Sequence, residues 1–514
     1  MTIDSSHNNN KRIAKNTLLL YFRMLLTMVV SLYTSRVVLG ALGVEDYGIY
    51  NVVGGVVAMF SMLSGSLSTA ISRFITFELG TGNKEKLKRV FSSSVTIQMG
   101  LSAIILVLAE TAGLWFLNNK MVIPDSRIYA ANWVYQLSLL TFVINLISIP
   151  YNAAIIAHER MSAFAYISIF EAGSKLVVAY CIVILPIDRL LLYAIMLTTI
   201  AIIIRLIYGV YCKKRFEECT YHFIYDHDLL KQMFGFAGWN FIGASSSILR
   251  DQGGNIIINL FCGPTINSAR AIASQVNIAI NSFVNNFMIA LNPQITKSYA
   301  NGDFSYMMNL LHRGSKFSFF ILFLISLPVI INTNYILEVW LVQVPEHTVK
   351  FVQLILIFGL CESISGPLIT VMLATGSIRN YQLVVGGLQM MNLPVSYMFL
   401  RMGFSPEIVL IVSIIISQLC LVSRLIMLSK MINLNIVSFF KKVYINAIVV
   451  TIFSIPIPLL VSIYLDENLI NTIIISVLSL GVTGIVIFIL GCEGDERKYI
   501  IEKVKSKLIK NGKN

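Results

Sequence analysis

Long apolar stretches follow one another along almost the whole chain, and this feature restricts the possible fold more than any other. A membrane-spanning helix needs roughly 20 mostly apolar residues, and such stretches run from residues 17–40 to a last one that ends near residue 490. Only 13% of the residues are charged, against about 25% in soluble domains. We therefore expect an all-α polytopic membrane protein with no room for a soluble catalytic domain.

The polar and turn-forming breaks between these stretches predict about fourteen transmembrane helices. Six are expected before the basic stretch 212–231, six after it, and two more near the C-terminus. The expected helices are 14–40, 47–72, 91–117, 130–157, 163–186 and 189–211, then 233–261, 266–291, 317–342, 347–375, 379–401 and 404–429, and finally 443–465 and 469–490.

These ranges predict five parts of the chain. They are an N-terminal six-helix lobe (1–215), a cytoplasmic linker (216–232), a C-terminal six-helix lobe (233–432), accessory helices 13 and 14 (433–491), and a basic amphipathic cytoplasmic tail (492–514). The tail has Ile500, Val504 and Leu508 at helical spacing among lysines, which is typical of a helix that lies on anionic lipid.

The distribution of positive charge predicts the orientation. The net charge is +13, and the lysines and arginines gather in alternate breaks, for example 84–89, 213–215 and 441–442. Cytoplasmic loops carry such an excess, so both termini are expected in the cytoplasm. The orientation of a membrane protein already explains this positive charge, so we do not expect nucleic acid as a partner.

The two six-helix sets show weak internal repetition. At an offset of about 220 residues, Gly43 aligns with Gly263, and Gly82 aligns with Gly302. At nearly the same offset, the segment Pro150 to Ala157 aligns with Pro367 to Ala374. An even number of helices per set gives parallel repeats, which favours two lobes that rock around a central cavity.

The helix pattern and two short motifs resemble a known family. Leu42, Gly43, Tyr47 and Gly48 form a Leu-Gly-x-x-x-Tyr-Gly element between the first two helices, and Ile149-Pro150-Tyr151 lies near the end of the fourth. These features are similar to those of the polysaccharide-export and O-antigen (Wzx-like) flippases. That family belongs to the multidrug/oligosaccharidyl-lipid/polysaccharide (MOP) exporter superfamily, whose fold has two MATE-like six-helix lobes, here with two extra C-terminal helices.

The resemblance implies a flippase in the bacterial cytoplasmic (inner) membrane. Its substrate would be an undecaprenyl-pyrophosphate-linked oligosaccharide, such as an O-antigen or capsule repeat unit, which moves from the inner to the outer leaflet by alternating access through a cationic central cavity. Its partners would be this anionic lipid-linked oligosaccharide, membrane lipids, and the polysaccharide polymerase and chain-length machinery. No cofactor, metal or catalytic residue is expected.

Two other functions stay open. A cation-coupled multidrug or metabolite exporter of the same superfamily would carry Asp or Glu in its cavity, whereas this chain has arginine deep in its first helix. A membrane glycosyltransferase or polymerase is disfavoured, because the longest expected outer loop has about a dozen residues and no acid, base and nucleophile come together in the sequence.

Ionisable residues inside spanning helices are the first candidates for substrate contact. Arg23 and Arg250 lie well inside the first and seventh expected helices, and Arg36 and Arg270 lie toward outer helix ends. Each could instead make a structural ion pair or anchor its helix. Asp251 follows Arg250 directly, and since neighbouring residues point apart on a helix, we expect Asp251 to serve another partner.

The remaining candidates are polar residues and isolated carboxylates. Asn240, Asn277 and Asn281 could bind sugar hydroxyls or hold helices together. Glu171 and Lys175 have the i,i+4 spacing of an ion pair. Glu110 and Glu362 are lone intramembrane carboxylates that could be coupling sites.

Three further arginines are expected to have no role in transport. Arg73, Arg205 and Arg424 lie within about two turns of expected cytoplasmic helix ends, where arginine can reach the headgroups. The cluster 225–228 in the middle linker, which contains Asp226, His227 and Asp228, lacks the spacing of a metal site.

Overall fold

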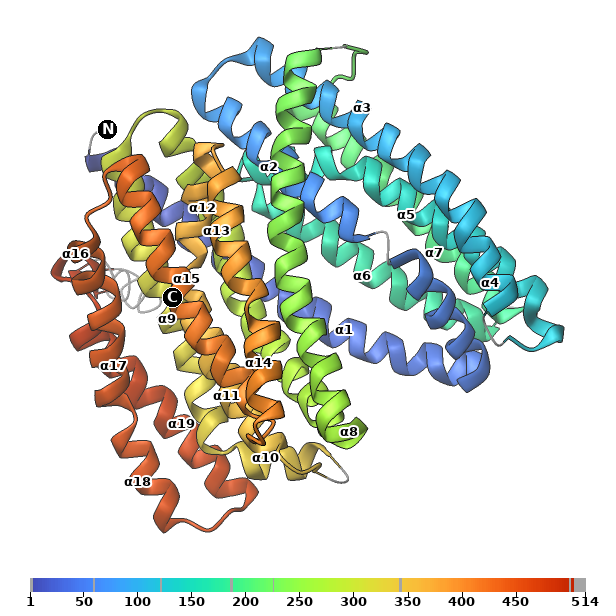
Figure 1. Cartoon of the computed structure of the whole chain (residues 1–514). Coiled ribbons are helices and arrows are strands. Elements are labelled where there is room, and N and C mark those ends of the chain that lie inside the picture. Colours follow the sequence, from blue (N-terminus) through green and yellow to red (C-terminus); the bar gives the residue numbers. More distant parts are fainter. Residues whose placement is uncertain are drawn as a thin grey trace, which may run out of the picture. The chain divides into compact units, whose positions relative to one another are not determined.

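The computed structural model of the chain describes residues 3–58, 61–120, 123–184, 188–224, 226–341, 344–498 and 501–502. Within these ranges the regular elements are helices and no strand occurs (Figure 1). The predicted all-α fold class is therefore confirmed.

Most helices of the first half follow the predicted ranges, but the predicted helix 47–72 is divided between the first two elements. The elements of this half are α1 (Ile3–Ala58), α2 (Ser61–Thr81), α3 (Lys84–Leu108), a π-helical segment (Ala109–Gly113), α4 (Leu114–Lys120), a 3-10 turn (Asp125–Arg127), α5 (Ile128–Ala157), α6 (Met161–Ile184) and α7 (Arg189–Arg215).

The second half begins with one very long helical segment. Its elements are α8 (His227–Ala300), α9 (Phe304–Ile331), α10 (Thr333–Trp340), α11 (Thr348–Ser363), α12 (Gly366–Thr375), α13 (Arg379–Met390), α14 (Asn392–Arg401), α15 (Ile408–Ile432), α16 (Ile436–Phe439), a π-helical segment (Phe440–Ile445), α17 (Asn446–Ser454), α18 (Pro456–Tyr464), α19 (Leu469–Val486) and a last π-helical segment (Ile487–Gly491). Most of the tail, including Val504 and Leu508, lies outside the described residues.

Among the described residues, ten helices are long and apolar enough to cross a membrane, and α11 with α12, bent by 41°, makes an eleventh. The other three predicted spans, 47–72, 233–261 and 266–291, fall in α1, α2 and α8. These segments are helical but carry many glycines, serines and asparagines, so length and composition alone do not identify them as spans.

Two of the long helices contain sharp turns. In α1 the backbone of Gly43 is non-helical, with φ 77° and ψ 171°, which only glycine adopts easily. In α8 a guanidinium nitrogen of Arg270 donates to the backbone oxygen of Asp251, although 19 residues of straight helix would span about 28 Å. Therefore α8 folds back on itself, as the predicted helices 233–261 and 266–291 require.

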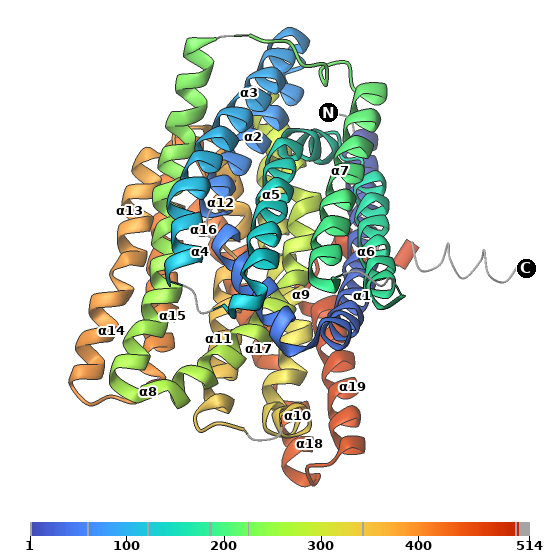
Figure 2. The same cartoon turned by 90° about the vertical axis from the view of Figure 1, so that its right-hand side faces the viewer.

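The chain divides by its internal packing into two compact units. Unit 1 comprises 1–244, 289–307 and 373–379, and unit 2 comprises 245–288, 308–372 and 380–514. In unit 1, α5 packs against α2, α3 and α7, and α1 packs against α6, as the two cartoon views agree (Figure 2). In unit 2, α15 packs against α11 and α14, and α19 packs against α17 and α18.

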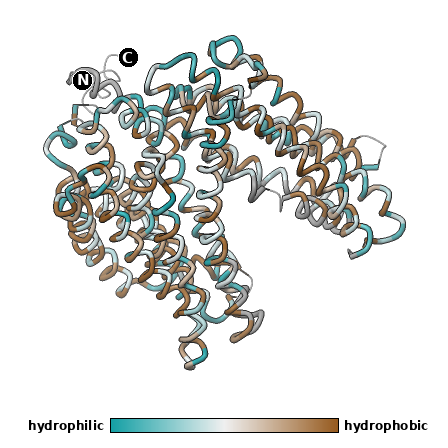
Figure 3. Tube along the Cα trace, turned by 45° about the horizontal axis from the view of Figure 1, so that its top comes forward, coloured by the Kyte–Doolittle hydropathy of each residue, from teal (hydrophilic) through white to brown (hydrophobic). Residues whose placement is uncertain are grey.

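The outward faces of the helices are apolar. Hydrophobic residues follow the helix shafts, and hydrophilic residues gather at helix ends and loops (Figure 3). On α18 and α19, for example, Ile463 and Ile470 are each 70% exposed. Such surface belongs against lipid, which agrees with a multi-pass membrane protein.

The turns that the repeat aligns have matching geometry. Gly82 and Gly302 both have left-handed backbones, with φ 74° and 73°. Asn83 and Asp303 follow them and cap the next helix, accepting from the amides of Lys86 and Tyr306 at 3.0 and 3.1 Å. A left-handed glycine followed by an Asx N-cap joins two helices in each half, in agreement with a duplicated unit.

Candidate functional site

Three arginines and two carboxylates meet inside unit 2. Arg250 pairs with Asp251 (Nε to Oδ1, 2.9 Å), and its guanidinium lies 5.0 Å from the centre of the Phe358 ring. Glu362, on α11, interacts electrostatically with both Arg250 and Arg424. We call Arg250, Asp251, Arg270, Glu362 and Arg424 the arginine cluster. It carries one more positive than negative formal charge.

Arg270 lies in the arginine cluster but forms no salt bridge with the described residues. Its side chain is 5% exposed, and Nη2 donates to the backbone oxygen of Asp251 at 3.3 Å. The guanidinium packs against Gly254, where a Cβ would clash with it. Within the described part of the chain, Nη1 of Arg270 has no hydrogen-bond partner, so it can donate to an anion or to water.

The expectation for Asp251 was wrong. Adjacent residues point apart on an ideal helix, yet both nitrogens Nε and Nη2 of Arg250 contact the Asp251 carboxylate, at 2.9 and 3.3 Å. The arginine side chain is long enough to curl back along the helix, and the pair leaves the Asp251 carboxylate exposed.

The expectations for Arg424 and Glu362 were also wrong. Arg424 is 1% exposed, and its Nη1 donates to the Ser365 hydroxyl at 2.9 Å, so it does not reach toward headgroups. Glu362 is not alone, because its electrostatic partners come from α8 and α15. Residues about 60 to 110 positions apart meet here through tertiary packing, and single-helix periodicity carries no signal for that.

Arg23 takes part in a separate polar stripe inside unit 1. Its Nη1 donates to the hydroxyl of Ser168 on α6 at 3.5 Å, and its guanidinium lies 4.6 Å from the centre of the Phe164 ring. Tyr208, on α7, interacts electrostatically with both Arg23 and Glu171. The sequence offered no indication of Tyr208, which is one tyrosine among many.

Two of the carboxylate candidates have partners. Lys175 donates to Glu171 at 2.6 Å on α6, so these residues form the expected i,i+4 ion pair. Glu110 accepts from the amide nitrogen of Gln136 on α5 at 3.1 Å. Neither carboxylate stands alone in unit 1.

The asparagine candidates are half-buried. Asn281 donates to the side-chain oxygen of Asn277 at 2.6 Å, and both face Gly359 on α11, where a Cβ would lie 3.0 Å from Asn277 Oδ1. This contact favours helix packing in unit 2. Asn240 is half-buried on α8 in unit 1. The side chain of Arg36 lies outside those that the structure describes.

Arg73 was expected to extend freely toward the headgroups, but its guanidinium is held by groups of the protein. Its Nε and Nη2 donate to the carbonyl oxygens of Leu373 and Ala374 at 3.3 and 3.0 Å. Its guanidinium also lies against the rings of Phe74, Phe77 and Phe236 at 4.7, 4.6 and 5.6 Å. All of these groups belong to unit 1.

A buried carboxylate in the turn after α5 joins three segments of unit 1. Glu159 pairs with Arg12 and Lys297, each at 2.8 Å, and also accepts from Gln294. Asn16 donates to the Glu159 backbone oxygen at 3.5 Å. Sequence reasoning missed this Glu159 cluster, because its members are spread between residues 12 and 297.

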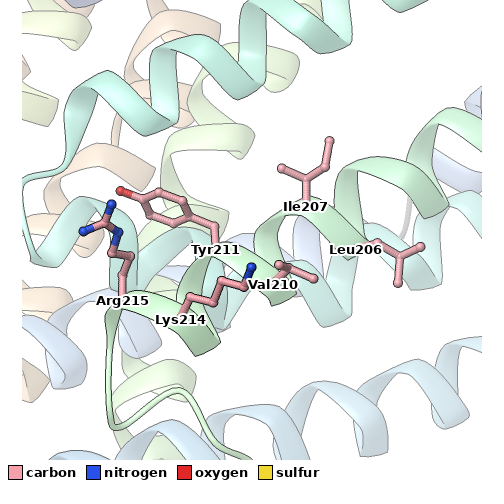
Figure 4. Close-up of a pocket in the computed structure, with 6 residues that line it drawn as sticks. All are labelled: Leu206, Ile207, Val210, Tyr211, Lys214 and Arg215. Atoms are coloured by element: carbon pink, nitrogen blue, oxygen red, sulfur yellow. The ribbon is translucent and has the colours of Figure 1, made fainter.

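A groove of about 510 Å³ runs along α7 (Figure 4). Leu206, Ile207 and Val210 make its apolar part, and Lys214 and Arg215 lie at the end of the helix. An apolar groove that ends in two cations suits an acyl chain with an anionic headgroup. Among the described residues, no group of His, Cys, Asp and Glu side chains could hold a metal ion.

Solved structures of membrane transporters share the fold of this chain. A solved structure of a mutant of the Vibrio cholerae MATE transporter VcmN matches with a TM-score of 0.70 and 16% identity, over 83% of this chain and 98% of that one. A MOP superfamily transporter from Pyrococcus furiosus matches with a TM-score of 0.66 and 13% identity, over 81% and 94%. These similarities confirm the MATE-like fold.

The chain belongs to the polysaccharide biosynthesis protein family, whose family model matches residues 11–299. It is 20% identical to the uncharacterized membrane protein EpsK of Bacillus subtilis over 300 residues. This alignment covers 57% of this chain and 58% of EpsK. The chain thus aligns with little more than half of that relative. The predicted resemblance is therefore confirmed at the level of the polysaccharide biosynthesis family and of the MATE-like fold.

Proposed function

We propose that this protein flips an anionic, polyprenyl-pyrophosphate-linked oligosaccharide across the bacterial cytoplasmic membrane by alternating access, with both termini in the cytoplasm. The supporting observation is the arginine cluster, above all buried Arg270, whose Nη1 has no hydrogen-bond partner among the described residues. A charge in hydrocarbon costs several kcal/mol unless it is paired. A pyrophosphate that passes Arg270 would supply that pairing during transport.

The alternative of a cation-coupled exporter receives less support. A cationic substrate or coupling ion would need unpaired carboxylates. Glu171 is paired with Lys175, and Glu110 accepts a hydrogen bond from Gln136. The arginine cluster itself has a surplus of positive charge, which would repel a cation.

Complementation of a strain that lacks the gene tests the proposal. We expect Arg250→Ala and Arg23→Ala each to abolish export of surface polysaccharide while the protein still inserts into the membrane. Arg401→Ala is the matched control, since Arg401 is exposed at the end of α14, and it should export normally. Full-length surface polymer with both the Arg250 and the Arg23 variant would show that these arginines do not carry substrate.

A further inference from the structure

A cavity of about 350 Å³ lies at one end of unit 1 and plays no part in the proposal above. It lies where α2 ends, α8 begins and the turn 376–379 leads into α13. We call it the Arg73 pocket. Its lining includes Arg73, Lys231, Arg379, Phe236, Trp239 and Ser377. This volume falls within the range of small-molecule sites, about 300–1,000 Å³.

The charge of the Arg73 pocket has one sign. Three cations line it, and none of its described lining residues is acidic. Within the described ranges, no carboxylate lies within 4.0 Å of Arg73, Lys231 or Arg379, and Glu78 near the end of α2 is already paired with Lys86 at 2.7 Å. Such a surplus of positive charge in a concave site attracts an anion.

The pocket is also built before any ligand arrives. The Arg73 guanidinium is fixed by two carbonyl oxygens and three aromatic rings. Its Nη1 makes no hydrogen bond to the described residues, so this nitrogen is available to a ligand. Arg379 lies 5.4 Å from the centre of the Trp239 ring. Held cations lose less side-chain entropy when they bind, which favours affinity.

We propose that the Arg73 pocket binds a lipid-borne phosphate, and that it receives the pyrophosphate of the lipid-linked substrate before transport. The inference rests on the proposed function and its orientation, in which these helix ends face the cytoplasm. Arginine and lysine bind phosphate oxygens through charge-assisted hydrogen bonds. The phosphate of a bulk anionic phospholipid shares this chemistry, so the experiment separates the two sources.

Trp239 provides the readout. The chain has four tryptophans, so replacing Trp115, Trp133 and Trp340 with Phe leaves Trp239 as the only one. The probe is farnesyl pyrophosphate, added to this full-length protein in phosphatidylcholine nanodiscs. We expect a saturable change in tryptophan emission, which farnesol does not produce because it lacks the phosphates.

The charge variants give the decisive comparison. Lys231→Ala with Arg379→Ala should weaken farnesyl pyrophosphate binding at least about tenfold, and Lys231→Arg with Arg379→Lys should keep most of it. Both positions are exposed, so the variants should fold. Arg401→Ala, which removes an exposed cation at the end of α14 outside the pocket, should leave binding unchanged.

If phosphatidylglycerol nanodiscs compete with farnesyl pyrophosphate at equal affinity, the pocket binds phosphate, but the phosphate is that of bulk lipid. No saturable change, or equal affinity in the double alanine variant, would overturn the proposal. If farnesyl pyrophosphate binds but the protein flips no substrate, the proposed function alone is contradicted. If the double alanine variant still flips its substrate normally, the loading role alone is contradicted.

Discussion

Glu159 holds a backbone conformation that few side chains adopt. Its φ is 57°, in the left-handed region that costs most residues about 1–2 kcal/mol. The aligned position in the second repeat is Gly376, with φ 77°, which adopts this region without penalty. We infer that the first repeat keeps a glutamate here because its buried carboxylate joins Arg12, Gln294 and Lys297.

Replacing Glu159 separates the backbone contribution from that of the charge. Glu159→Gln leaves Lys297 without its partner and should destabilise the protein by about 3 kcal/mol. Glu159→Gly and Glu159→Ala both lose the carboxylate, but glycine removes the backbone strain and should be about 1 kcal/mol more stable than alanine. Thermal unfolding in detergent measures both differences. Equal stability of the glycine and alanine variants would contradict the strain.

Glu218 gives the fold a dependence on pH. Burial would raise the pKa of Glu218, but hydrogen bonds from His158, at 2.5 Å, and from its own backbone hold that pKa below its ordinary value of 4.5. A carboxyl with a depressed pKa stabilises the folded state above its unfolded pKa, and this contribution is lost as the pH falls through the folded pKa. Below pH 4.5 the unfolding temperature should therefore fall.

The matched variant isolates that contribution. Glu218→Gln should lower the unfolding temperature at neutral pH and flatten its decline below pH 4.5. Glu217→Gln is the control, because Glu217 is exposed and pairs with Lys84, which is exposed as well. If the Glu218 variant kept the full acid dependence, other carboxyl groups would be responsible for it.

At the scale of elements, the sequence predicts helices well and their contacts poorly. Apolar stretches and the charged breaks between them predict most of the helices. The turn at Gly43 and the hairpin within α8 lie at predicted breaks. The Glu159 cluster and the arginine cluster depend on residues far apart along the chain. Neither hydropathy nor helical spacing brings such residues together, so Arg424, Glu362 and Tyr208 could not be chosen.

The repeated turns provide a test at this scale. Gly82→Ala and Gly302→Ala force an alanine into the left-handed region, and each should cost about 1–2 kcal/mol. Gly481→Ala is the control, since this glycine lies inside α19 with open space around its Cβ position, and alanine there should stabilise by up to about 1 kcal/mol. Thermal unfolding of the three variants measures this, and an unaffected Gly302→Ala would contradict the matching turn geometry.

For the molecule as a whole, the distribution of charge supports the proposed anionic substrate. Arg23 is half-buried in one unit and Arg270 is buried in the other, and the Arg73 pocket adds three more cations. If these groups act on one substrate, each should affect transport of a pyrophosphate lipid and none should affect insertion of the protein.

Flipping in proteoliposomes is the decisive measurement for an arginine-dependent flippase. A fluorescent polyprenyl-pyrophosphate disaccharide is added to vesicles, and a membrane-impermeant quencher reports how fast the probe changes leaflet. We expect the protein to flip this probe, to leave the matching neutral polyprenyl disaccharide in place, and to slow at least about tenfold with Arg250→Gln or Arg270→Gln. Equal movement of the charged and neutral probes, or unchanged rates in both variants, would contradict an arginine-dependent flippase.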